Sequence, residues 1–532
     1  MMTTTETKQK YKVLIPTAGI GSRLCDLTKY LNKSLVSVGN KPVISRIIDM
    51  FPENVEFVIA LGYKGDLVKQ FLSLAYPNRH FEFSTVEKYD GDGSGLGLTI
   101  LSCEKFLQEP FVFCSCDTIV TDEIPYPSKN IVGYARRDDK SQYRTVDIVD
   151  GKVVELLEKG LHKENSMPYI GLACINDYQA FWEKMHEGKN DAILIGESYA
   201  LEHFAKDGTL YSKEFNWFDT GNQAELQKTL EYFKEDDAPN ILPKANEAIW
   251  FVDDVVIKYS DDKKFISDRV ERINYLRNFV PEIISSTENM YAYKKADGYV
   301  LSKIADISVF EKLLEFSKKM WLNSILNNQE LIDFRKTCEN FYYKKTLQRI
   351  ELYYQNFDVI DALTEINGIK MPKLSSLLEK IDWENIFNGI PSGFHGDFHF
   401  ENILYDDKND KFTFLDWRQN FGNSLSIGDV YYDLAKLLHG LIICHELIHQ
   451  DKYSVQINNN VINYSFDRKP ILISCEEYFY KWLEDNNYDV KKVKILTALI
   501  YLNIAALHHY PYCHLLYNLG KTMLYDNLNT TH

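Results

Sequence analysis

The stretch Val13-Leu14-Ile15-Pro16-Thr17-Ala18-Gly19-Ile20-Gly21-Ser22-Arg23-Leu24 determines which fold we expect for the first half of the chain. Its apolar beginning predicts a buried β-strand over residues 11–16, and its two glycines predict a turn whose N–H groups approach a ligand closely. Such converging N–H donors suit a phosphate chain. Arg23 adds a guanidinium group, which can bind phosphate through two parallel hydrogen bonds. The loop alone supports phosphate binding and an ordinary tight turn equally.

Strands and helices alternate beyond this loop. Further strands are expected at 55–61, 111–116 and 130–135, with helical spacing of apolar residues at 42–50 and 66–75. This alternation predicts an α/β domain in which a mainly parallel, Rossmann-like sheet is covered by helices.

The length of 532 residues exceeds the roughly 250–300 residues that one hydrophobic core usually serves, so we expect more than one domain. A polar, turn-rich segment at 234–243 is the expected linker. It divides a first domain, 1–233, from a second domain, 244–532. The second domain begins with a β-rich lobe, about 244–300, and continues as a mostly helical lobe, about 301–532, which predicts an α+β fold.

The formal net charge of −16 argues against a nucleic-acid or anionic-membrane partner, because phosphate-rich surfaces attract basic proteins. Residues 1–10 lack an apolar leader, and apolar stretches such as 495–507 are too short to span a bilayer. The nine cysteines include no CxxC pair and are expected to be reduced. We therefore expect a cytoplasmic protein that acts on small molecules, and the sequence leaves open whether it forms a homo-oligomer.

The region from Leu14 to Pro42, which includes Lys33, resembles the signature of sugar-phosphate nucleotidyltransferases, the enzymes that make nucleotide sugars. The resemblance continues in the family's order through Gly95-Leu96-Gly97, Ser115-Cys116-Asp117, Leu157-Glu158-Lys159, Tyr169-Ile170-Gly171 and Trp217-Phe218-Asp219-Thr220-Gly221. Each match is weak alone, but their common order makes the set specific.

The resemblance implies a role for each matched residue. Nucleotide binding is implied for Ala18, Gly19, Gly21, Ser22, Arg23 and Gly95. The resemblance makes Arg23 and Lys33 catalytic groups on the triphosphate, Asp117 and Asp219 the ligands of Mg²⁺, and Glu158, Lys159 and Gly171 the sugar-phosphate site. These residue types suit the chemistry, because joining two anionic reactants requires charge neutralisation and alignment.

Two departures from the family pattern concern the substrates. Gly160 stands where the family often has proline, and residues 86–93 lack the glutamine that many members place near the base. The choice among CTP, GTP, UTP and dTTP therefore stays open.

A second motif, Gly393-Phe394-His395-Gly396-Asp397-Phe398-His399-Phe400-Glu401-Asn402-Ile403-Leu404, lies in the other half of the chain. A β-hairpin is expected near 402–416, and its two ends bring Asn402 and Asp416 together, where they can share a cation. Asp397 precedes Asn402 by five residues and can accept a proton from a substrate hydroxyl. Phosphoryl transfer from ATP requires this layout.

This motif resembles that of the aminoglycoside phosphotransferase and choline kinase group, which has the protein-kinase-like fold, and residues 428–435 match the group's next segment. The resemblance implies that Asp397 is the catalytic base, that Asn402 and Asp416 bind Mg²⁺, and that ATP is the phosphoryl donor.

The same resemblance implies an ATP-binding lobe upstream of the motif. In that lobe Lys258, on a strand, is expected to bind nucleotide and to pair with Glu271 on the following helix. His395, Asp429 and Asp433 are expected to brace loops rather than to react.

One further pattern, His445-Glu446-Leu447-Ile448-His449, fits the HExxH arrangement of zinc proteases. It falls on the helix that follows the kinase-like segment, so we expect helix packing rather than zinc binding.

Two phosphate chemistries in one chain predict a bifunctional enzyme that uses Mg²⁺, ATP and a second nucleoside triphosphate. The expected sequence is phosphorylation of a sugar at its anomeric hydroxyl by the second domain, then nucleotidyl transfer in the first, in support of capsule or other surface glycan synthesis. Two alternatives remain: a choline, ethanolamine or polyol kinase coupled to cytidylyl transfer, and a chain in which one domain is inactive and regulatory.

Overall fold

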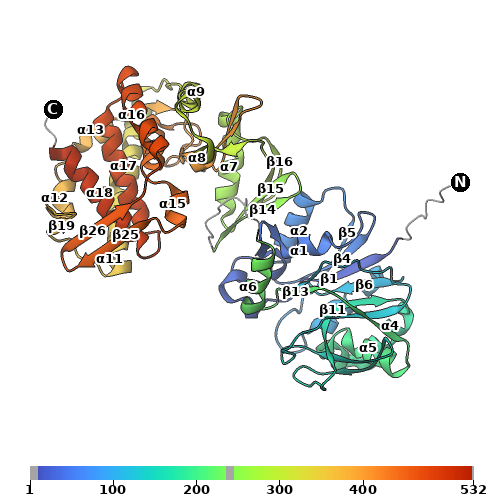
Figure 1. Ribbon diagram of the computed structural model, residues 1–532. Helices are drawn as coiled ribbons and strands as arrows, with labels where there is room; N and C mark the ends of the chain where they lie inside the picture. Colours follow the sequence, from blue (N-terminus) through green and yellow to red (C-terminus); the bar gives the residue numbers. More distant parts are fainter. Residues whose placement is uncertain (1–9, 235–244, 530–532) are drawn as a thin grey trace. The chain divides into compact units, whose positions relative to one another are not determined.

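The computed structural model describes residues 10–234 and 245–529 (Figure 1). Contacts divide the chain into two compact units, residues 1–263 with 284–293 and residues 264–283 with 294–532. Apart from Lys234, the expected linker lies outside the described residues.

A nine-stranded sheet forms the centre of the first unit, in the order β5-β4-β1-β6-β11-β8-β12-β10-β9. The strands are β1 (Lys12–Pro16), β4 (Glu56–Leu61), β5 (Phe81–Thr85), β6 (Phe111–Cys114), β8 (Asn130–Tyr134), β9 (Thr145–Val149), β10 (Lys152–Leu157), β11 (Met167–Ile175) and β12 (Leu210–Glu214). The first four in spatial order are parallel, as expected from the alternating pattern. The remainder of the sheet is mixed, because β9 and β10 are joined by a tight hairpin at Asp150 and Gly151 and β11 runs antiparallel to its neighbours.

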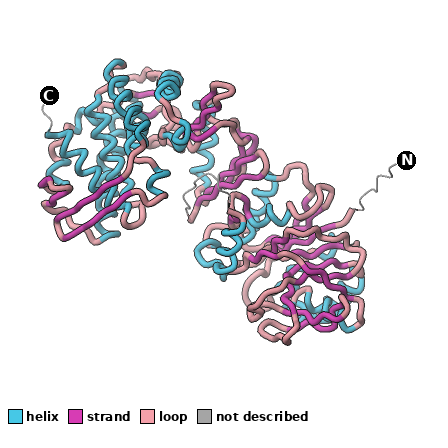
Figure 2. The backbone as a smooth tube through the Cα atoms, in the orientation of Figure 1, coloured by secondary structure: helices cyan, strands magenta, loops and turns pink. Residues whose placement is uncertain are grey.

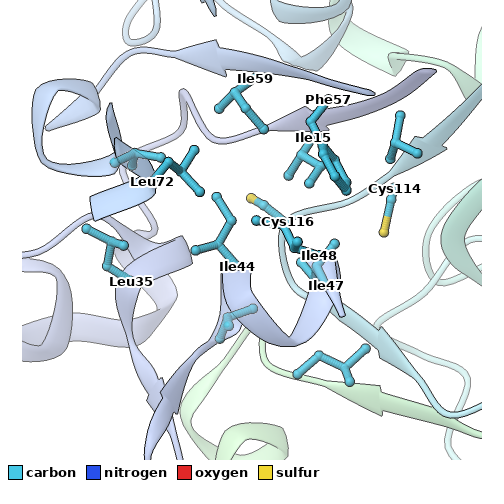
Figure 3. Packing of buried hydrophobic residues seen from close by; sticks show 14 of the residues in the cluster. Ile15, Leu35, Ile44, Ile47, Ile48, Phe57, Ile59, Leu72, Cys114 and Cys116 are labelled. Atoms are coloured by element: carbon cyan, nitrogen blue, oxygen red, sulfur yellow. The ribbon is translucent and has the colours of Figure 1, made fainter. Parts of the chain in front are cut away.

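Buried apolar side chains cover both faces of this sheet. Neighbouring side chains on a strand point to opposite faces, so successive residues of one strand enter different clusters. Ile15 of β1 packs with Phe57, Ile59 and helix α1 (Val43–Ile48) in one cluster (Figure 3), whereas Leu14 packs in the cluster on the other face. The other helices of the unit are α2 (Gly65–Ala75), α3 (Leu96–Leu101), α4 (Tyr178–Ile195), α5 (Ser198–Lys206) and α6 (Gln223–Tyr232). The α/β prediction is thereby confirmed.

A second, four-stranded sheet has the order β14-β15-β17-β16 and shares the core of the first unit. Its strands are β14 (Glu247–Val252), β15 (Val255–Ser260), β16 (Ile283–Ser286) and β17 (Met290–Lys294). Trp250 is fully buried with its ring 5.1 Å from that of Phe71, and its Nε1 donates to Oγ of Ser37 at 3.0 Å. The contacts thus group β14 and β15 with the first unit, whereas the sequence pattern assigns them to the second domain. The expected domain limits remain a proposal.

The second unit is mainly helical (Figure 2), and its expected hairpin is present as β22 (Ile403–Asp406) and β23 (Lys411–Phe414). The longer helices are α7 (Lys263–Leu276), α9 (Ile307–Lys318), α10 (Asn328–Glu339), α11 (Lys345–Phe357), α14 (Val430–Ile442), α16 (Pro470–Asp485), α17 (Val490–Ala505) and α18 (Tyr512–Asn529), with the short α15 (His445–His449). A further sheet has the order β20-β19-β26-β25 and was not expected from the sequence. Its strands are β19 (Thr364–Ile366), β20 (Ile369–Met371), β25 (Tyr453–Asn458) and β26 (Val461–Phe466).

Within 10–234 and 245–529, no helix combines the length and the hydrophobicity needed to cross a membrane. All nine cysteines lie among these residues; each is free, and only Cys25 is exposed.

We predict that Trp250→Ala destabilises the first unit by about 3–5 kcal/mol, the usual cost of truncating a fully buried tryptophan. Hydrogen exchange followed by mass spectrometry should show lower protection in peptides that cover β1 and β4. Val149→Ala, at a position 55% exposed in the same unit, is the matched control and should change stability by no more than about 0.5 kcal/mol. Unchanged protection of β1 and β4 in Trp250→Ala would contradict a shared core.

Candidate active sites

A cavity of about 570 Å³ opens beside the carboxyl ends of β1 and β6 in the first unit. Of the residues that the sequence predicts for this site, those lining the cavity are Ala18, Gly19, Arg23, Lys33, Gly95, Asp117, Lys159, Gly171 and Asp219. Gly21, Ser22 and Glu158 do not line it. Gly21 directly precedes the short helix at 22–28. Glu158 is exposed and lies in a turn, in which the N–H of Leu161 donates to the carbonyl of Glu158.

The two expected metal-binding carboxylates face each other across Gly221. A Cβ atom on Gly221 would lie 3.1 Å from Oδ2 of Asp117, 3.1 Å from Oδ1 of Asp219 and 3.3 Å from Nη2 of Arg23. At most twice 3.1 Å therefore separates the two carboxylate oxygens. Glycine is required here because any side chain would fill the space between the carboxylates.

Lys33 sets the charge of Asp117. Its Nζ lies 3.2 Å from Oδ2 of Asp117, whose Oδ1 accepts from Oγ of Ser115 at 2.6 Å. Burial alone raises the pKa of Asp117, but the charge of Lys33 outweighs it and lowers that pKa to about 2. Burial and the neighbouring Asp117 instead raise the pKa of Asp219, which accepts from the hydroxyl of Tyr143 at 2.9 Å. The pair therefore contains one firmly ionised carboxylate and one that is easier to protonate.

Close packing leaves no room for a side chain at either glycine of the turn that is predicted to lie near the base. A Cβ on Gly95 would meet the carbonyl oxygen of Ile193 at 2.2 Å, and one on Gly97 would meet that of Ala192 at 1.9 Å. The backbone near the end of α4 thus passes directly against this turn.

Several residues of the cavity were not predicted from the sequence. They are Tyr89, Ser94, Thr99, Thr118, Gln142, Tyr143, Arg144, Leu194, Ile195, Glu197 and Ser198. Many come from loops far apart in the sequence, and no local motif marks them. The one acid among them, Glu197, is 4% exposed, and its Oε2 makes no hydrogen bond to a described residue. Burial raises the pKa of Glu197 to about 7.

The second candidate site lies at one end of the β22–β23 hairpin. The N–H of Leu415 donates to the carbonyl of Asn402 at 2.7 Å, so Asn402 and Asp416 stand at the same end of the hairpin, as expected. Nδ2 of Asn402 donates to Oδ2 of Asp397 at 3.2 Å. The structure thus brings the three predicted residues together.

Asp397 lies between a lysine and a histidine. Its Oδ1 is 2.7 Å from Nζ of Lys436, and its Oδ2 is 3.7 Å from Nε2 of His399. Burial favours the protonated acid, but the Lys436 charge holds the pKa of Asp397 well below its usual range. Asp397 is therefore ionised at neutral pH, as a proton acceptor must be.

Buried hydrogen bonds hold the loop that carries Asp397. Asp433 accepts the N–H groups of His395 and Gly396 at 2.7 and 2.6 Å, and Nε2 of His395 lies 2.9 Å from the carbonyl of Leu415. Arg272, 1% exposed, donates to the carbonyls of His395 and Leu425. These contacts agree with the bracing roles expected for His395 and Asp433.

Asp416 has a left-handed backbone, with φ of 56°, and its Oδ1 lies 2.5 Å from Nη1 of Arg269. A non-glycine residue in this region is strained, and such residues cluster at functional sites. Asp416 is also 38% exposed, so the carboxylate remains accessible.

The structure places Lys258 and Glu271, the pair expected in the ATP-binding lobe, in different units. Lys258 is buried on β15 in the first unit, and Glu271 is exposed on α7 in the second. The buried acid on α7 is Asp268, which the sequence pattern did not single out. The pairing of Lys258 with Glu271 stays a prediction.

Comparison with known proteins finds relatives for two parts of the chain. Residues 376–448 match the phosphotransferase enzyme family, APH. The bifunctional protein GlmU of Methanococcus maripaludis strain C5 is 22% identical over 254 residues, which are 46% of this chain and 60% of that protein. The glucose-1-phosphate cytidylyltransferase of Salmonella typhimurium strain LT2 is 33% identical over 64 residues, which are 12% of this chain and 25% of that protein.

Among solved structures, the CTP:phosphocholine cytidylyltransferase LicC of Streptococcus pneumoniae is similar at a TM-score of 0.38 and 16% identity, with 42% of this chain and 100% of that chain covered. The N-terminal region is thus similar in sequence to sugar-phosphate nucleotidyltransferases, and the C-terminal region to phosphotransferases.

We predict that Glu197 makes the first unit less stable as the pH rises. The folded state holds this carboxyl group protonated up to a pKa of about 7, whereas the unfolded chain releases the proton near 4.5. Stability from this group is complete below pH 4.5 and falls as the pH rises to 7, by about 3 kcal/mol in all. Melting curves of the unliganded protein from pH 5 to 8 test this.

Glu197→Gln removes the ionisation and keeps the shape, so it should melt higher than the parent at pH 8 and similarly at pH 5. Glu202→Gln, on the exposed face of α5, is the control and should follow the parent at every pH. Equal melting of Glu197→Gln and the parent at pH 8 would refute the buried, neutral carboxyl group.

Proposed function

We propose that the first unit transfers a nucleotidyl group from a nucleoside triphosphate to a sugar phosphate. The observation that carries this proposal is the convergence of Asp117, Asp219 and Arg23 around Gly221 in one cavity, with Lys33 and Lys159 on its wall. In this reaction a phosphate oxygen of the acceptor attacks the α-phosphorus, a new P–O bond forms, and pyrophosphate leaves.

The residues present fit a divalent cation, since two carboxylates face a space that no side chain fills. Held by Asp117 and Asp219, Mg²⁺ would neutralise charge on the phosphate oxygens. Arg23 and Lys33 would bind the triphosphate, and the Gly95 turn would lie against the base. Lys159 would bind the acceptor phosphate, with Gly171 beside the sugar. Their task is alignment and charge neutralisation, and the reaction needs no protein nucleophile.

For the second unit we infer phosphoryl transfer from ATP to a hydroxyl group. Asp397 would accept the hydroxyl proton as oxygen attacks the γ-phosphorus and ADP leaves. Asn402 and Asp416 offer the amide and carboxylate oxygens that Mg²⁺ prefers, at one end of a hairpin. The nucleotide-binding roles that the sequence resemblance implies for Lys258 and Glu271 are kept in this proposal.

The two reactions form a sequence if the phosphorylated product of the second unit is the acceptor of the first. A free sugar would then be phosphorylated at its anomeric hydroxyl and activated as a nucleotide sugar for surface glycan synthesis. Because both reactions consume nucleoside triphosphates, we place the protein in the cytoplasm. The domain limits in this proposal are 1–233 and 244–532.

A choline or ethanolamine acceptor is the second candidate, and the charges near Asp397 disfavour it. A choline site needs aromatic faces open to a cation. Here the Phe341 ring already contacts the Arg418 guanidinium, with Cζ at 4.9 Å from its centroid, and Nζ of Lys345 lies at 4.5 Å. Burial, then Arg418, Arg349 and Lys436, lower the pKa of Lys345 to about 7. This concentration of positive charge favours a neutral or anionic acceptor.

We predict that the two activities can be removed separately. Asp117→Asn should reduce nucleotidyl transfer to supplied sugar phosphate at least 100-fold and leave phosphorylation intact, because it weakens only the first metal site. Asp397→Asn should do the reverse. Mass spectrometry of products from sugars, amino alcohols, Mg²⁺ and all nucleoside triphosphates measures both reactions. Loss of both activities in either folded variant would refute this division, and intact activity of both would refute the assigned residues.

We also predict that the cations near Phe341 select the acceptor. Arg349→Gln should raise the KM for the accepted hydroxyl compound about tenfold, the effect of losing one charge-assisted contact of about 1.4 kcal/mol, while the KM for ATP stays unchanged. Lys344→Gln, at an exposed position on the same helical segment, is the matched control. Efficient phosphorylation of choline by the parent protein would contradict this prediction.

A further inference from the structure

Three histidines and a glutamate meet close to Asp397 in the second unit. His399 and Glu401 belong to the loop that follows Asp397, His439 lies on α14, and His445 begins α15. None of the four has a role in the proposed phosphoryl transfer.

Three of these residues have the spacing of metal ligands. One potential ligand atom from each of His399, Glu401 and His445 lies within 4.8 Å of the other two. Nδ1 of His399 is 3.2 Å from Oε2 of Glu401, and the rings of His399 and His445 are 5.3 Å apart between centroids. Ligand atoms around a tetrahedral zinc ion with bonds of about 2.0–2.2 Å lie about 3.3–3.6 Å apart. The pair at 3.2 Å already fits this spacing, and small side-chain rotations would bring wider pairs to it.

His439 is the second, independent observation. It is 2% exposed, and neither ring nitrogen makes a hydrogen bond to a described residue. Its ring centroid lies 5.8 Å from that of His445 and 6.2 Å from that of His399. Leaving a buried imidazole without partners costs free energy, which a ligand at this position would recover.

We propose that His399, Glu401, His439 and His445 bind a divalent transition-metal ion, and that the ion is Zn²⁺. Three imidazoles and one carboxylate are donors that suit zinc, whereas Mg²⁺ prefers oxygen ligands. The site is therefore distinct from the one at Asn402 and Asp416.

The HExxH pattern does not describe this site. Its second histidine, His449, is exposed, and Glu446 pairs with Lys469 at 2.5 Å. His445 instead meets residues far from it in the sequence. His449 thus lies outside the cluster, whereas His445, for which the sequence predicted helix packing, is part of it.

The site would fix the position of a residue that contacts the candidate base. Nε2 of His399 lies 3.1 Å from Nδ2 of Asn402 and 3.7 Å from Oδ2 of Asp397, so an ion held through Nδ1 would hold the ring that touches both. Zinc binding itself does not depend on the proposed phosphoryl transfer; only this effect on Asp397 rests on it.

The full chain, stripped of metal with a chelator, is titrated with Zn²⁺ in excess Mg²⁺, and retained zinc is counted by mass spectrometry after gel filtration. We expect one high-affinity zinc per chain and, with Co²⁺ as the probe, the visible absorption of a tetrahedral site. His439→Ala and His445→Ala should each weaken binding at least tenfold, and His449→Ala should not. Circular dichroism checks folding, and Glu401→Gln replaces any variant that fails to fold.

No retained zinc in the parent protein overturns the proposal. Equal zinc affinity in His445→Ala and the parent, or an equal loss in His449→Ala, overturns the assigned ligands. Kinase assays of the zinc-loaded and stripped protein separate the two proposals, since zinc bound to a chain without ATP-dependent phosphorylation would refute the proposed function and leave the metal site standing.

Discussion

Both candidate sites depend on a partly buried carboxylate that is kept ionised by a lysine. Lys33 lies 3.2 Å from Asp117, and Lys436 lies 2.7 Å from Asp397. Loss of solvent favours the neutral acid, and in each case the adjacent ammonium group reverses that preference. An ionised carboxylate can hold a cation or accept a proton over the pH range in which phosphate groups carry their full charge. Each lysine therefore determines what its carboxylate can do, in addition to any contact it makes with a substrate.

The two units place these carboxylates by different means. Asp117 follows β6, and the short strand β13 (Trp217–Asp219) pairs with β7 (Thr118–Val120), so that Asp219 lies opposite Thr118. Backbone pairing thus brings together two residues about a hundred positions apart. In the second unit the hairpin brings its own ends together, and Asp433 fixes the preceding loop through two N–H groups. The first arrangement depends on the whole sheet, the second on a local turn and one buried acid.

This difference explains what could be predicted from the sequence. The α/β alternation, the hairpin and the grouping of Asp397, Asn402 and Asp416 follow from local patterns, and the structure contains them. Glu197 and Tyr143 could not be assigned to the first cavity, because they reach it only through tertiary packing. The sheet built from β19 (Thr364–Ile366) and β20 (Ile369–Met371) did carry a signal, since Asn367-Gly368 is a strong hairpin turn between two strands. The position of Trp250 in the core of the first unit had no such signal.

The path of the chain bears on whether the two activities are separable. The chain leaves the first unit after residue 263, returns at 284, and leaves again after 293. Helix α7, which carries Arg269 and Arg272, is thus joined at both ends to strands of the other unit, while its arginines contact Asp416 and the loop of His395. A single cut near residue 244 would remove β14 and Trp250 from the first core. The backbone thus passes between the two units three times, so no single cut of the chain separates them.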